Sequence, residues 1–295
     1  MSSSPSTVRI GDRTIKVTNL DKVMYPVTGT TKGEVIAYYA AVAEWFVPHA
    51  AGRPATRKRW VDGVGTAEEP GHAFFNKNLD SSTPEWVRTH TIEHAADDNT
   101  YPLIDEPATL VWLAQMASLE IHVPQWRVNA AGEPQRPDRL VLDLDPGPGA
   151  GLAECVELAF LIREVLDGMG TASVPVTSGS KGLHLYAGLD GAMTSEEVSE
   201  LARQLAYSLE SLRPDLVVSG IKKSLRKGKV LLDWSQNNGS KTTIAPYSLR
   251  GRQRPTVAVP WAWDELDDDL RHLELDEVPE RLNRLGDPLA VLLRE

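Results

Sequence analysis

The segment 140–149, LVLDLDPGPG, restricts the fold of this chain more than any other stretch of its sequence. Its apolar run predicts a buried strand, which the proline and glycine residues that follow bring to an end. Asp143 and Asp145 interrupt the run, and because alternate residues of a strand face the same side, their carboxylates lie about 7 Å apart along one face. Two unpaired carboxylates repel each other, which pushes one of them toward protonation. A divalent cation removes that repulsion.

These carboxylates therefore predict a site for a hard metal ion. Mg²⁺ and Mn²⁺ prefer oxygen ligands and typically take one or two carboxylates together with substrate phosphates. Pro146 and Gly147 place Asp143 and Asp145 at the carboxyl end of the strand, where ligands of α/β sheets usually bind. Asp233 stands in a second apolar run, VLLDW, and three carboxylates from two strands can hold two metal ions ~3.5–4 Å apart for phosphoryl transfer.

Two simpler interpretations of the carboxylates stay open. An Asp-x-Asp pattern alone is weak evidence for a metal, and Asp143 and Asp145 can equally belong to an edge strand whose exposed face is acidic. Asp233 can form a structural ion pair with one of the bases that surround it in sequence.

Charge is unevenly distributed along the chain. A net charge of −10 over 295 residues argues mildly against a nucleic-acid-binding protein. However, the segment 216–263 holds nine lysine and arginine residues and a single acid, Asp233. The tail 264–295 holds eleven acids against four arginines, and we interpret it as a solvated helical face. A chain whose excess acid lies in its tail can still present a basic groove elsewhere.

Composition argues against several classes of protein. No run of 18 apolar residues is present, so no membrane-spanning helix is expected. The N-terminal segment MSSSPSTVRIGDR lacks the apolar core of a secretory signal. Cys155 is the single cysteine, which excludes a disulfide framework and a zinc cluster. A cytoplasmic location is the default expectation.

Periodicity and turn residues predict strands and helices that alternate without strict βαβ regularity, which indicates an α+β or mixed α/β fold. We expect one catalytic domain over 1–295, with a disordered N-terminus over about 1–7 and an acidic helical C-terminal tail over about 264–295.

Two of the expected helices have recognisable N-caps, which are Thr30 or Thr31 for the first and Thr194 or Ser195 for the second. The expected elements are a hairpin over 7–19, a helix from 30 that stops near Pro48, a strand over 53–60, a helix and then an extended piece over 106–124, a strand over 139–146, two strands with a glycine loop over 172–189, a strand over 228–236, and helices over 151–170, 194–214 and 265–295.

The glycine loop in TSGSKGLHLY is a candidate cradle for a triphosphate. Glycines let backbone N–H groups approach an anion closely, and hydroxyl and ammonium groups add donors. The spacing of a Walker A loop is absent, and a plain hairpin turn is an equally good interpretation of the loop alone. His184, like His122 in EIHVPQW, is by itself more typical of a core or surface histidine than of a ligand. The polar candidates of the loop are Ser178, Ser180, Lys181 and His184.

Two further short motifs combine basic and aromatic residues. In TRKRW, Arg57 and Arg59 lie on one strand face and Lys58 on the other, unless this is a solvated edge strand. In AFFNK, Phe74 and Phe75 cannot both enter one core face. One of them is therefore either half-exposed or available for stacking on a nucleic-acid base.

Taken together, several long motifs in this order resemble the polymerase domain of bacterial ligase D, a member of the archaeo-eukaryotic primase superfamily. The resemblance runs from about Val17 to about Leu270 and implies a primase-polymerase fold, with central β-sheets flanked by helices. The motifs that carry it are GRPATRKRW, SLEIHVPQW, LVLDLDPG, TSGSKGLHLY and KSLRKGKVLLDWSQNNGSKTTIAPYSLRGR.

The resemblance also implies roles for individual residues. Asp143, Asp145 and Asp233 would form the catalytic, metal-binding triad. Lys22 and Lys32 would recognise the 5′-phosphate of a gap, although from the residues alone both are ordinary surface lysines. Phe74 and Phe75 would pack on DNA near that phosphate. The residues that would bind the incoming nucleotide are Lys58, His122, Ser178, Ser180, Lys181, His184, Arg226 and Arg250.

The implied activity is template-dependent nucleotidyl transfer to primer 3′-ends at short gaps or broken DNA ends. The family prefers ribonucleoside triphosphates and uses two Mn²⁺ ions, or Mg²⁺. The sequence ends at Glu295 without a ligase or phosphoesterase region, so it resembles the stand-alone members, and end joining with Ku and a separate ligase stays open beside excision-repair gap filling. A nucleoid-associated monomer is expected. Two rivals are a non-catalytic DNA-end-binding scaffold and a D-x-D sugar-nucleotide transferase.

Overall fold

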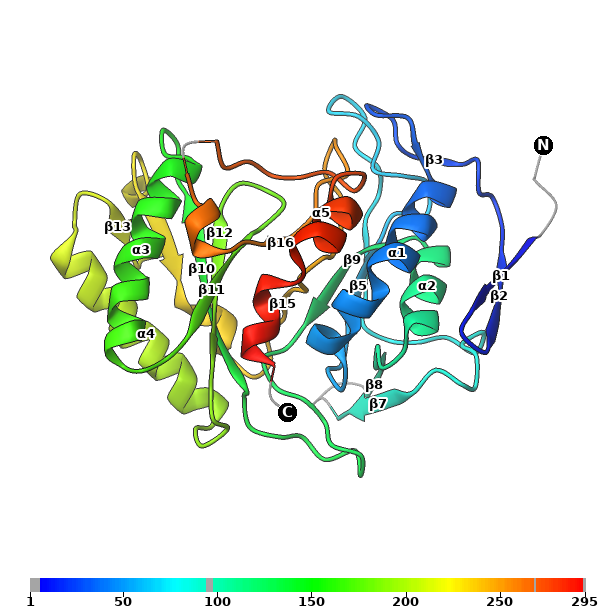
Figure 1. The fold of residues 1–295 in the computed structure, drawn as a ribbon, viewed down its shortest axis with the longest axis horizontal. Coiled ribbons are helices and arrows are strands. Elements are labelled where there is room, and N and C mark those ends of the chain that lie inside the picture. The colour runs from blue at the N-terminus through cyan, green and yellow to red at the C-terminus, as the bar shows by residue number, and fades with distance from the viewer. Residues whose placement is uncertain (1–5, 94–97, 268, 294–295) are drawn as a thin grey trace.

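The computed structural model describes residues 6–93, 98–267 and 269–293 (Figure 1). Most of the expected disordered N-terminus, 1–5, lies outside the described residues. Ser6 and Thr7 were expected in it, but they belong to β1 (Ser6–Ile10), which pairs with β2 (Arg13–Val17) in the predicted hairpin. The fold is a mixed α+β architecture built around two larger sheets, as the sequence predicted.

The larger sheet has six strands, and β10 lies in its interior. Its neighbours are β12 and β14, both antiparallel to it, so the interpretation of 139–146 as an acidic edge strand is wrong. In spatial order the strands are β13 (Val217–Val218), β14 (Val230–Asp233), β10 (Arg139–Pro146), β12 (Leu183–Gly188), β11 (Ser173–Thr177) and β16 (Val259–Pro260).

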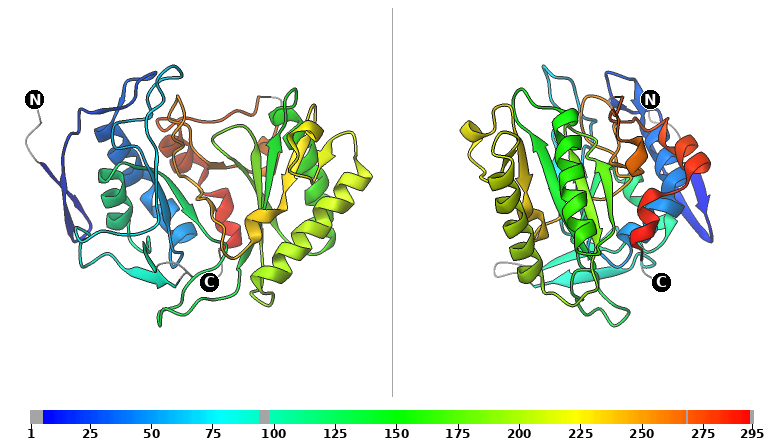
Figure 2. Two further views of the ribbon diagram at one scale, coloured as in Figure 1. Left: turned by 180° about the vertical axis from the view of Figure 1, so that it is seen from behind. Right: turned by 60° about the vertical axis from the view of Figure 1, so that its left-hand side comes forward.

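Helices α3 (Leu152–Gly168) and α4 (Ser195–Leu212) pack against this sheet, side by side in the right-hand view of Figure 2. Leu142 and Leu144 of β10 are fully buried in the core that these helices share. Burial of each such leucine contributes ~1.5–3 kcal/mol. The opposite side of β10 carries Asp143 and Asp145, so the apolar and acidic faces alternate as the sequence predicted. Thr194 caps α4 through a capping box with Glu197.

The second sheet has four strands and packs with α1 (Lys32–Ala50) and α2 (Pro107–Gln115). Thr31 caps α1 as expected, but the helix continues through Pro48 to Ala50. Pro48 lacks a backbone N–H and its ring meets the carbonyl group four residues earlier, but only two residues of the helix follow it, so the disturbance is confined to the last turn. In spatial order the strands are β15 (Thr243–Ile244), β9 (Ser118–Val123), β5 (Thr56–Arg59) and β6 (Phe74–Asn76).

The position of β5 corrects the interpretation of TRKRW as a solvated edge strand. β5 lies between β9 and β6, and Arg57 is only 4% exposed. Two short antiparallel pairs complete the strands. They are β3 (Val23–Tyr25) with β4 (Thr30–Thr31), and β7 (Thr89–Ile92) with β8 (Asn99–Pro102).

The acidic tail is less helical than the sequence suggested. Its helical parts are α5 (Val278–Leu285) and the 3₁₀ turns η3 (Trp263–Glu265) and η4 (Pro288–Leu292), while the described residues of 266–277 follow an irregular path. The acids of the tail do not form one solvated helical face, because three of them pair with arginines, one of which, Arg254, lies outside the tail. These ion pairs join Glu274 to Arg254, Glu277 to Arg271 and Glu265 to Arg281.

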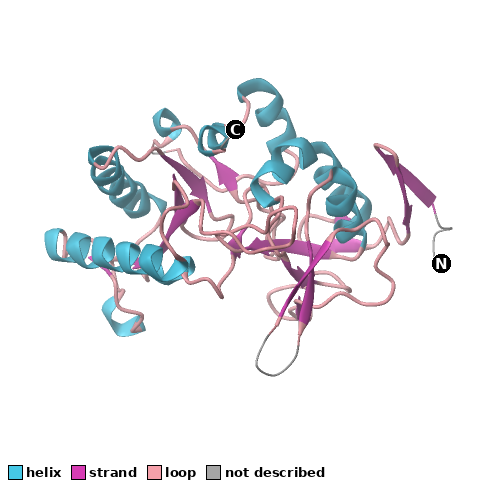
Figure 3. Cartoon of the chain, turned by 90° about the horizontal axis from the view of Figure 1, so that it is seen from below, coloured by secondary structure: helices cyan, strands magenta, loops and turns pink. Residues whose placement is uncertain are grey.

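The remaining 3₁₀ turns are η1 (Lys223–Leu225) and η2 (Trp234–Asn237). Seen from below in Figure 3, most strands lie between the helices, whereas the N-terminal pair of β1 and β2 lies outside them. One hydrophobic cluster draws residues from both sheets and from α1 to α5. Within the described parts of the chain, no helix is both long and apolar enough to cross a bilayer.

Candidate active site

Three polar side chains form a row across neighbouring strands of the larger sheet. Asp143 of β10 is the direct partner of His184 on β12 and of Asp233 on β14. Directly opposed residues of antiparallel strands share a face, with Cβ atoms ~4.5–5.5 Å apart. The Nε2 atom of His184 lies 3.4 Å from Oδ1 of Asp143. Asp145 stands two residues further along the same face, so the sheet brings all three predicted carboxylates together.

The residues that follow Asp233 fix its carboxylate. Asp233 is both the last residue of β14 and the N-cap of η2, and its Oδ1 accepts hydrogen bonds from the backbone N (2.9 Å) and the hydroxyl (2.5 Å) of Ser235. The Nζ atom of Lys241 donates to the same hydroxyl. No ion pair between Asp233 and a base occurs in the described part of the chain, so the ion-pair interpretation is not supported.

Gln236 joins two of the carboxylates. Its Nε2 atom lies 3.3 Å from Oδ2 of Asp143 and 3.3 Å from Oδ2 of Asp233. One neutral donor between two anions occupies a position that suits a cation. Sequence reasoning missed this residue, although it stands in DWSQ, three positions after Asp233.

The carboxylates fit a hard metal ion by their chemistry. Desolvation raises the pKa of Asp145, and the negative charges of Asp143 and Asp233 raise it further. Oxygen ligands under mutual repulsion are the donor set that Mg²⁺ or Mn²⁺ neutralises. As the side chains stand, the described residues contain no group of three His, Cys, Asp or Glu side chains close enough to hold an ion.

The glycine loop between β11 and β12 is a tightly packed hairpin turn. Ser178 accepts hydrogen bonds from the backbone N atoms of Ser180 and Gly182, each 3.2 Å long. A Cβ atom on Gly182 would lie 1.9 Å from the carbonyl oxygen of Leu144, so only glycine lets the loop approach β10 this closely. Lys181 is exposed at the tip. The loop is therefore the hairpin turn of the simpler interpretation, and its role as an anion cradle stays a prediction.

Arginines from the segment after β15 hold the other side of this loop. Gly179 has φ +65°, and a Cβ atom there would lie 2.7 Å from Cγ of Arg250. Arg252 donates from Nη2 to the hydroxyl of Ser180 over 2.7 Å. Arg252 is a second residue that the sequence analysis did not assign.

Glu120 connects Arg250 to the second sheet and was not singled out from sequence. It is 3% exposed, accepts a 2.9 Å hydrogen bond from the backbone N of Gly251, and lies 3.7 Å from Nε of Arg250. His122 lies on the same strand face, with Nε2 2.9 Å from Oε2 of Glu120. Burial raises the pKa of Glu120, but the His122 hydrogen bond and the Arg250 charge outweigh it and hold the pKa at about 2. The sequence feature that could have identified Glu120 is its position two residues before His122, which places both side chains on the same face of a strand.

Lys58 and Phe75 complete this face of the second sheet. Lys58 is the strand partner of both Glu120 and Phe75, and its Nζ atom lies 4.7 Å above the ring of Trp60. The ring centroids of Phe75 and His122 are 6.0 Å apart. Phe74 is 46% exposed and Phe75 56%, so both aromatic rings, rather than one, are open to solvent.

Arg226 brings a positive charge to the open end of β10. The backbone of Arg226 packs so closely on Gly147 that a Cβ atom there would lie 1.9 Å from its carbonyl oxygen. The charge of Arg226 opposes the rise in the pKa of Asp145. Thus a residue 81 positions from Asp145 in sequence (226 − 145) lies beside it in space.

Lys22 and Lys32 form a separate basic cluster with Arg59. Lys32 is only 7% exposed and donates to the carbonyl oxygen of Thr18 over 3.0 Å, so its interpretation as a surface lysine is wrong. Desolvation, with the charges of Lys22 and Arg59, lowers the pKa of Lys32 to about 8. Lys22 is held by Asp62, 2.6 Å from its Nζ atom.

Comparisons with a family model and with curated proteins agree on the family to which this chain belongs. The family model described as LigD, primase-polymerase domain, matches residues 31–289. The multifunctional non-homologous end joining protein LigD of Mycolicibacterium smegmatis is 53% identical over 279 residues, covering 94% of this chain and 36% of that protein. The bifunctional non-homologous end joining protein LigD of Bacillus subtilis is 30% identical over 277 residues, covering 93% and 43%. This chain therefore spans less than half the length of these curated relatives.

A solved structure agrees with the sequence comparisons. It is the polymerase domain from Mycobacterium tuberculosis ligase D in complex with DNA, and it matches with a TM-score of 0.89 and 52% identity. The match covers 94% of this chain and 97% of the other. At this identity the likeness extends beyond the arrangement of the elements to half of the side chains.

Proposed function

This chain belongs to the LigD primase-polymerase family, and on that basis we propose that it is a template-dependent nucleotidyltransferase of DNA repair. The single observation that carries the proposal is the pairing of Asp143 with Asp233 beside the glycine loop. Carboxylates for metal ions and donors for phosphates stand at the same edge of one sheet. Nucleotidyl transfer requires these two groups side by side.

In this proposal Asp143, Asp145 and Asp233 hold two divalent ions, Mn²⁺ or Mg²⁺. When bound, the ions supply activation of the primer 3′-hydroxyl and neutralisation of the triphosphate. Gln236 and Ser235 orient the carboxylates through the hydrogen bonds described above. His184 lies against Asp143 on the side nearer the loop.

The loop and the second sheet bind the nucleotide. Arg250 links the two, since it packs on Gly179 of the loop and lies 3.7 Å from Glu120 of the second sheet. Cationic side chains there neutralise charge that develops on the phosphates. The proposed nucleotide-binding residues are Lys58, His122, Ser178, Ser180, Lys181, His184, Arg226 and Arg250.

DNA contacts are assigned to two other places on the chain. We propose that Lys22 and Lys32 bind the 5′-phosphate of a gap, since they present two positive charges next to each other. The exposed rings of Phe74 and Phe75 offer surfaces on which DNA bases can stack. Preference for ribonucleotides is part of the same proposal, and so is action either in end joining with Ku or in excision-repair gap filling.

The chain is further proposed to work as one catalytic domain, which the hydrophobic cluster that draws on both sheets supports. A monomer is part of the same proposal. A nucleoid-associated, cytoplasmic location follows from DNA as the substrate.

Primer extension on a short gapped duplex tests the proposal. The duplex carries a downstream 5′-phosphate, and Mn²⁺ is supplied with either ribonucleotides or deoxyribonucleotides. We expect templated addition that favours ribonucleotides and stops in EDTA. A DNA-end-binding scaffold would instead bind the duplex equally well in EDTA and incorporate nothing. A sugar-nucleotide transferase would turn over its donor without DNA.

A further inference from the structure

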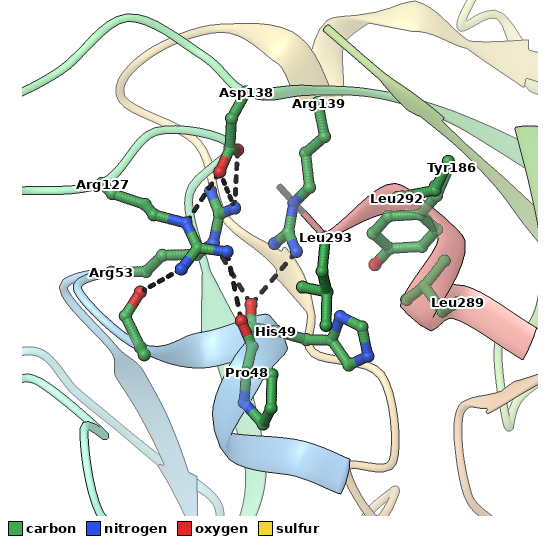
Figure 4. A pocket seen from close by; sticks show the side chains of 11 residues that line it. Pro48, His49, Arg53, Arg127, Asp138, Arg139, Tyr186, Leu289, Leu292 and Leu293 are labelled. Carbon is green, nitrogen blue, oxygen red and sulfur yellow. Dashed lines mark hydrogen bonds and ion pairs between the residues drawn. The ribbon is translucent and has the colours of Figure 1, made fainter. Parts of the chain in front are cut away.

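Two carboxylates inside the fold lie among basic side chains, and their partners differ. The first, Asp138, accepts hydrogen bonds from Nη2 of Arg53, over 2.6 and 2.7 Å, and from Nε of Arg127 over 2.7 Å (Figure 4). The same arginines donate to the carbonyl oxygens of His49 and Pro48 at the end of α1. These bonds satisfy free carbonyl groups of the helix terminus, so this first cluster has a structural role.

The second carboxylate, that of Glu120, divides its oxygens between a backbone group and a histidine ring. Oε1 accepts a hydrogen bond of 2.9 Å from the backbone N of Gly251, and Oε2 lies 2.9 Å from Nε2 of His122. Glu120 is ionised, because its pKa is held at about 2. An ionised carboxylate can only accept hydrogen bonds, so Nε2 of His122 carries a proton.

The ring of His122 is uncharged at neutral pH. Desolvation lowers the pKa of His122 and outweighs the hydrogen bond to Glu120, and the charges of Arg250 and Lys58 lower the pKa further. A neutral imidazole has one N–H group and one nitrogen with a lone pair. Because Glu120 holds the proton on Nε2, the lone pair is on Nδ1, which can only accept a hydrogen bond.

Nδ1 of His122 is available to a ligand. No hydrogen bond within the described part of the chain reaches this atom, and the atom retains accessible surface on a side chain that is 15% exposed. The centroid of the ring lies 6.0 Å from that of Phe75, which is 56% exposed. His122 thus places a free acceptor beside an aromatic surface that is open to solvent.

The lone pair on Nδ1 restricts which part of a nucleotide His122 can contact. The oxygens of an ionised triphosphate are acceptors themselves, so they do not pair with this atom. The donor groups of the four bases differ, whereas templated addition requires one site to accept all four. The sugar hydroxyls are the donors that all four ribonucleotides share.

We propose that Glu120 is a positioning residue, which fixes the Nε2–H tautomer of His122 so that Nδ1 accepts a hydrogen bond from a sugar hydroxyl of the incoming nucleotide. This inference rests on the proposed nucleotidyltransferase function. It gives the buried glutamate a role that a purely structural ion pair would not have, because the glutamate determines the polarity of the histidine toward the ligand.

The substitution Glu120→Gln reverses that polarity, because only one orientation of the new amide fits. The peptide group that carries the N–H of Gly251 is fixed, since the hydroxyl of Tyr25 donates to the carbonyl oxygen of Arg250 over 2.9 Å. The amide oxygen must therefore face Gly251, which turns the amide NH₂ group toward His122. That group donates to Nε2 and moves the ring proton to Nδ1.

NMR spectra of the full chain with ¹⁵N-labelled histidine show which ring nitrogen carries the proton. At mildly alkaline pH and without nucleotide, we expect Nε2–H in the native chain and Nδ1–H in Glu120→Gln. The signals of His122 are identified by their absence from His122→Asn. Glu44→Gln, which replaces an exposed glutamate of α1, should keep the native tautomer. A proton on Nδ1 of native His122, or an unchanged tautomer in a folded Glu120→Gln chain, would overturn the proposal.

Nucleotide binding tests the contact with the sugar. Calorimetric titration with Mn²⁺ and without DNA compares ATP with two analogues, in which fluorine replaces either the 2′- or the 3′-hydroxyl and cannot donate a hydrogen bond. We expect one analogue to bind the native chain at least about threefold more weakly than ATP, which is the contribution of one hydrogen bond. That analogue identifies the hydroxyl that Nδ1 contacts. In Glu120→Gln the difference should disappear, because Nδ1–H no longer requires a donor.

The outcomes separate this inference from the proposed function. Equal binding of ATP and both analogues by the native chain, or an unchanged difference in Glu120→Gln, would overturn the proposal. If Glu120→Gln does not fold, the tautomer and the analogue comparison of the native chain provide the test. A native chain that binds no nucleotide would refute the proposed function, and the NMR spectra would then still show whether Glu120 fixes the tautomer.

Discussion

Asp143 and Asp233 are directly paired residues of adjacent antiparallel strands, and one amide nitrogen, that of Gln236, lies 3.3 Å from an oxygen of each. The two carboxylates are 90 positions apart in sequence (233 − 143), yet the sheet fixes their separation before any ligand arrives. Preorganised charge of this kind costs little rearrangement when the metal ions and the triphosphate bind.

Removing any carboxylate of the row should abolish nucleotide addition. Asp143→Asn, Asp145→Asn and Asp233→Asn each delete a charge on which metal binding depends, and we expect extension to fall by at least about a hundredfold. Single-nucleotide extension on the gapped duplex measures the loss, and fluorescence anisotropy should report nearly normal DNA binding. Asp264→Asn, in the exposed tail, is the matched control. Near-normal extension by any of the three variants would remove that residue from the proposed site.

Gln236→Ala should affect the metal dependence of the reaction more than the binding of DNA. Without the shared amide the two carboxylates lose a common restraint, so a higher Mn²⁺ concentration is needed for half-maximal extension. Gln204→Ala, which removes an exposed glutamine hydrogen-bonded to Glu200 on α4, is the control. A Gln236→Ala enzyme with an unchanged Mn²⁺ titration curve would show that the amide contact has no positioning role.

A methyl group on Gly182 should disturb the glycine loop. The added Cβ would lie 1.9 Å from the carbonyl oxygen of Leu144, so the loop must move away from β10. We expect Gly182→Ala to raise the KM for nucleotide and to lower the midpoint of thermal unfolding. Gly168→Ala, on a helix with no atom within 4 Å of the new methyl group, should be neutral or slightly stabilising. Equal behaviour of the two variants would contradict the tight packing of the loop.

The ion pairs of Glu120 predict a distinctive pH dependence of stability. Its pKa of about 2 lies below the ordinary value of 4.5, so its stabilising contribution is present above about pH 4.5 and is lost as the pH falls toward 2. A shift of that size corresponds to roughly 3 kcal/mol. The free energy of unfolding, measured by urea titration between pH 5 and pH 3, should therefore fall more steeply for the native chain than for Glu120→Gln. Parallel curves would refute the assignment.

Lys32 should make recognition of a 5′-phosphate depend on pH. Its pKa of about 8 means that the ammonium group is charged below that pH and becomes neutral above it. The preference for gapped DNA with a 5′-phosphate over a 5′-hydroxyl should thus be largest near pH 7 and decline through pH 8. Binding titrations at several pH values measure this ratio. Lys32→Gln should show a smaller preference that no longer declines through pH 8, and Lys16→Gln, which replaces an exposed lysine of β2, should behave like the native chain.

Local sequence features predicted many elements of this fold. They failed where the structure depends on contacts between segments that are distant in sequence. The α+β class, the caps Thr31 and Thr194, and the alternation of apolar and acidic residues in β10 followed from local periodicity, and the structure confirms them. The direct pairing of Asp143 with Asp233 depends on strand register, which no local pattern specifies. The roles of individual site residues were assigned from the family resemblance, and those roles stay predictions.

The errors have physical causes. Lys32 was expected at the surface because lysine is rarely buried, but Thr18 supplies a carbonyl oxygen for it inside the fold. Acid-rich segments often form solvated helices, yet Glu274 and Glu277 are used in ion pairs with arginines. Gln236 and Glu120 were not identified because neither type of residue, taken alone, signals a site.

The contact of Gly179 with Arg250, and of Arg250 with Glu120, has a consequence for how this protein can change over evolutionary time. None of these three residues can be replaced alone without leaving either a steric overlap or an uncompensated buried charge. Substitutions at the three positions should therefore occur together in distant homologues, so that the glycine loop and the second sheet, although separate in sequence, are inherited as one unit.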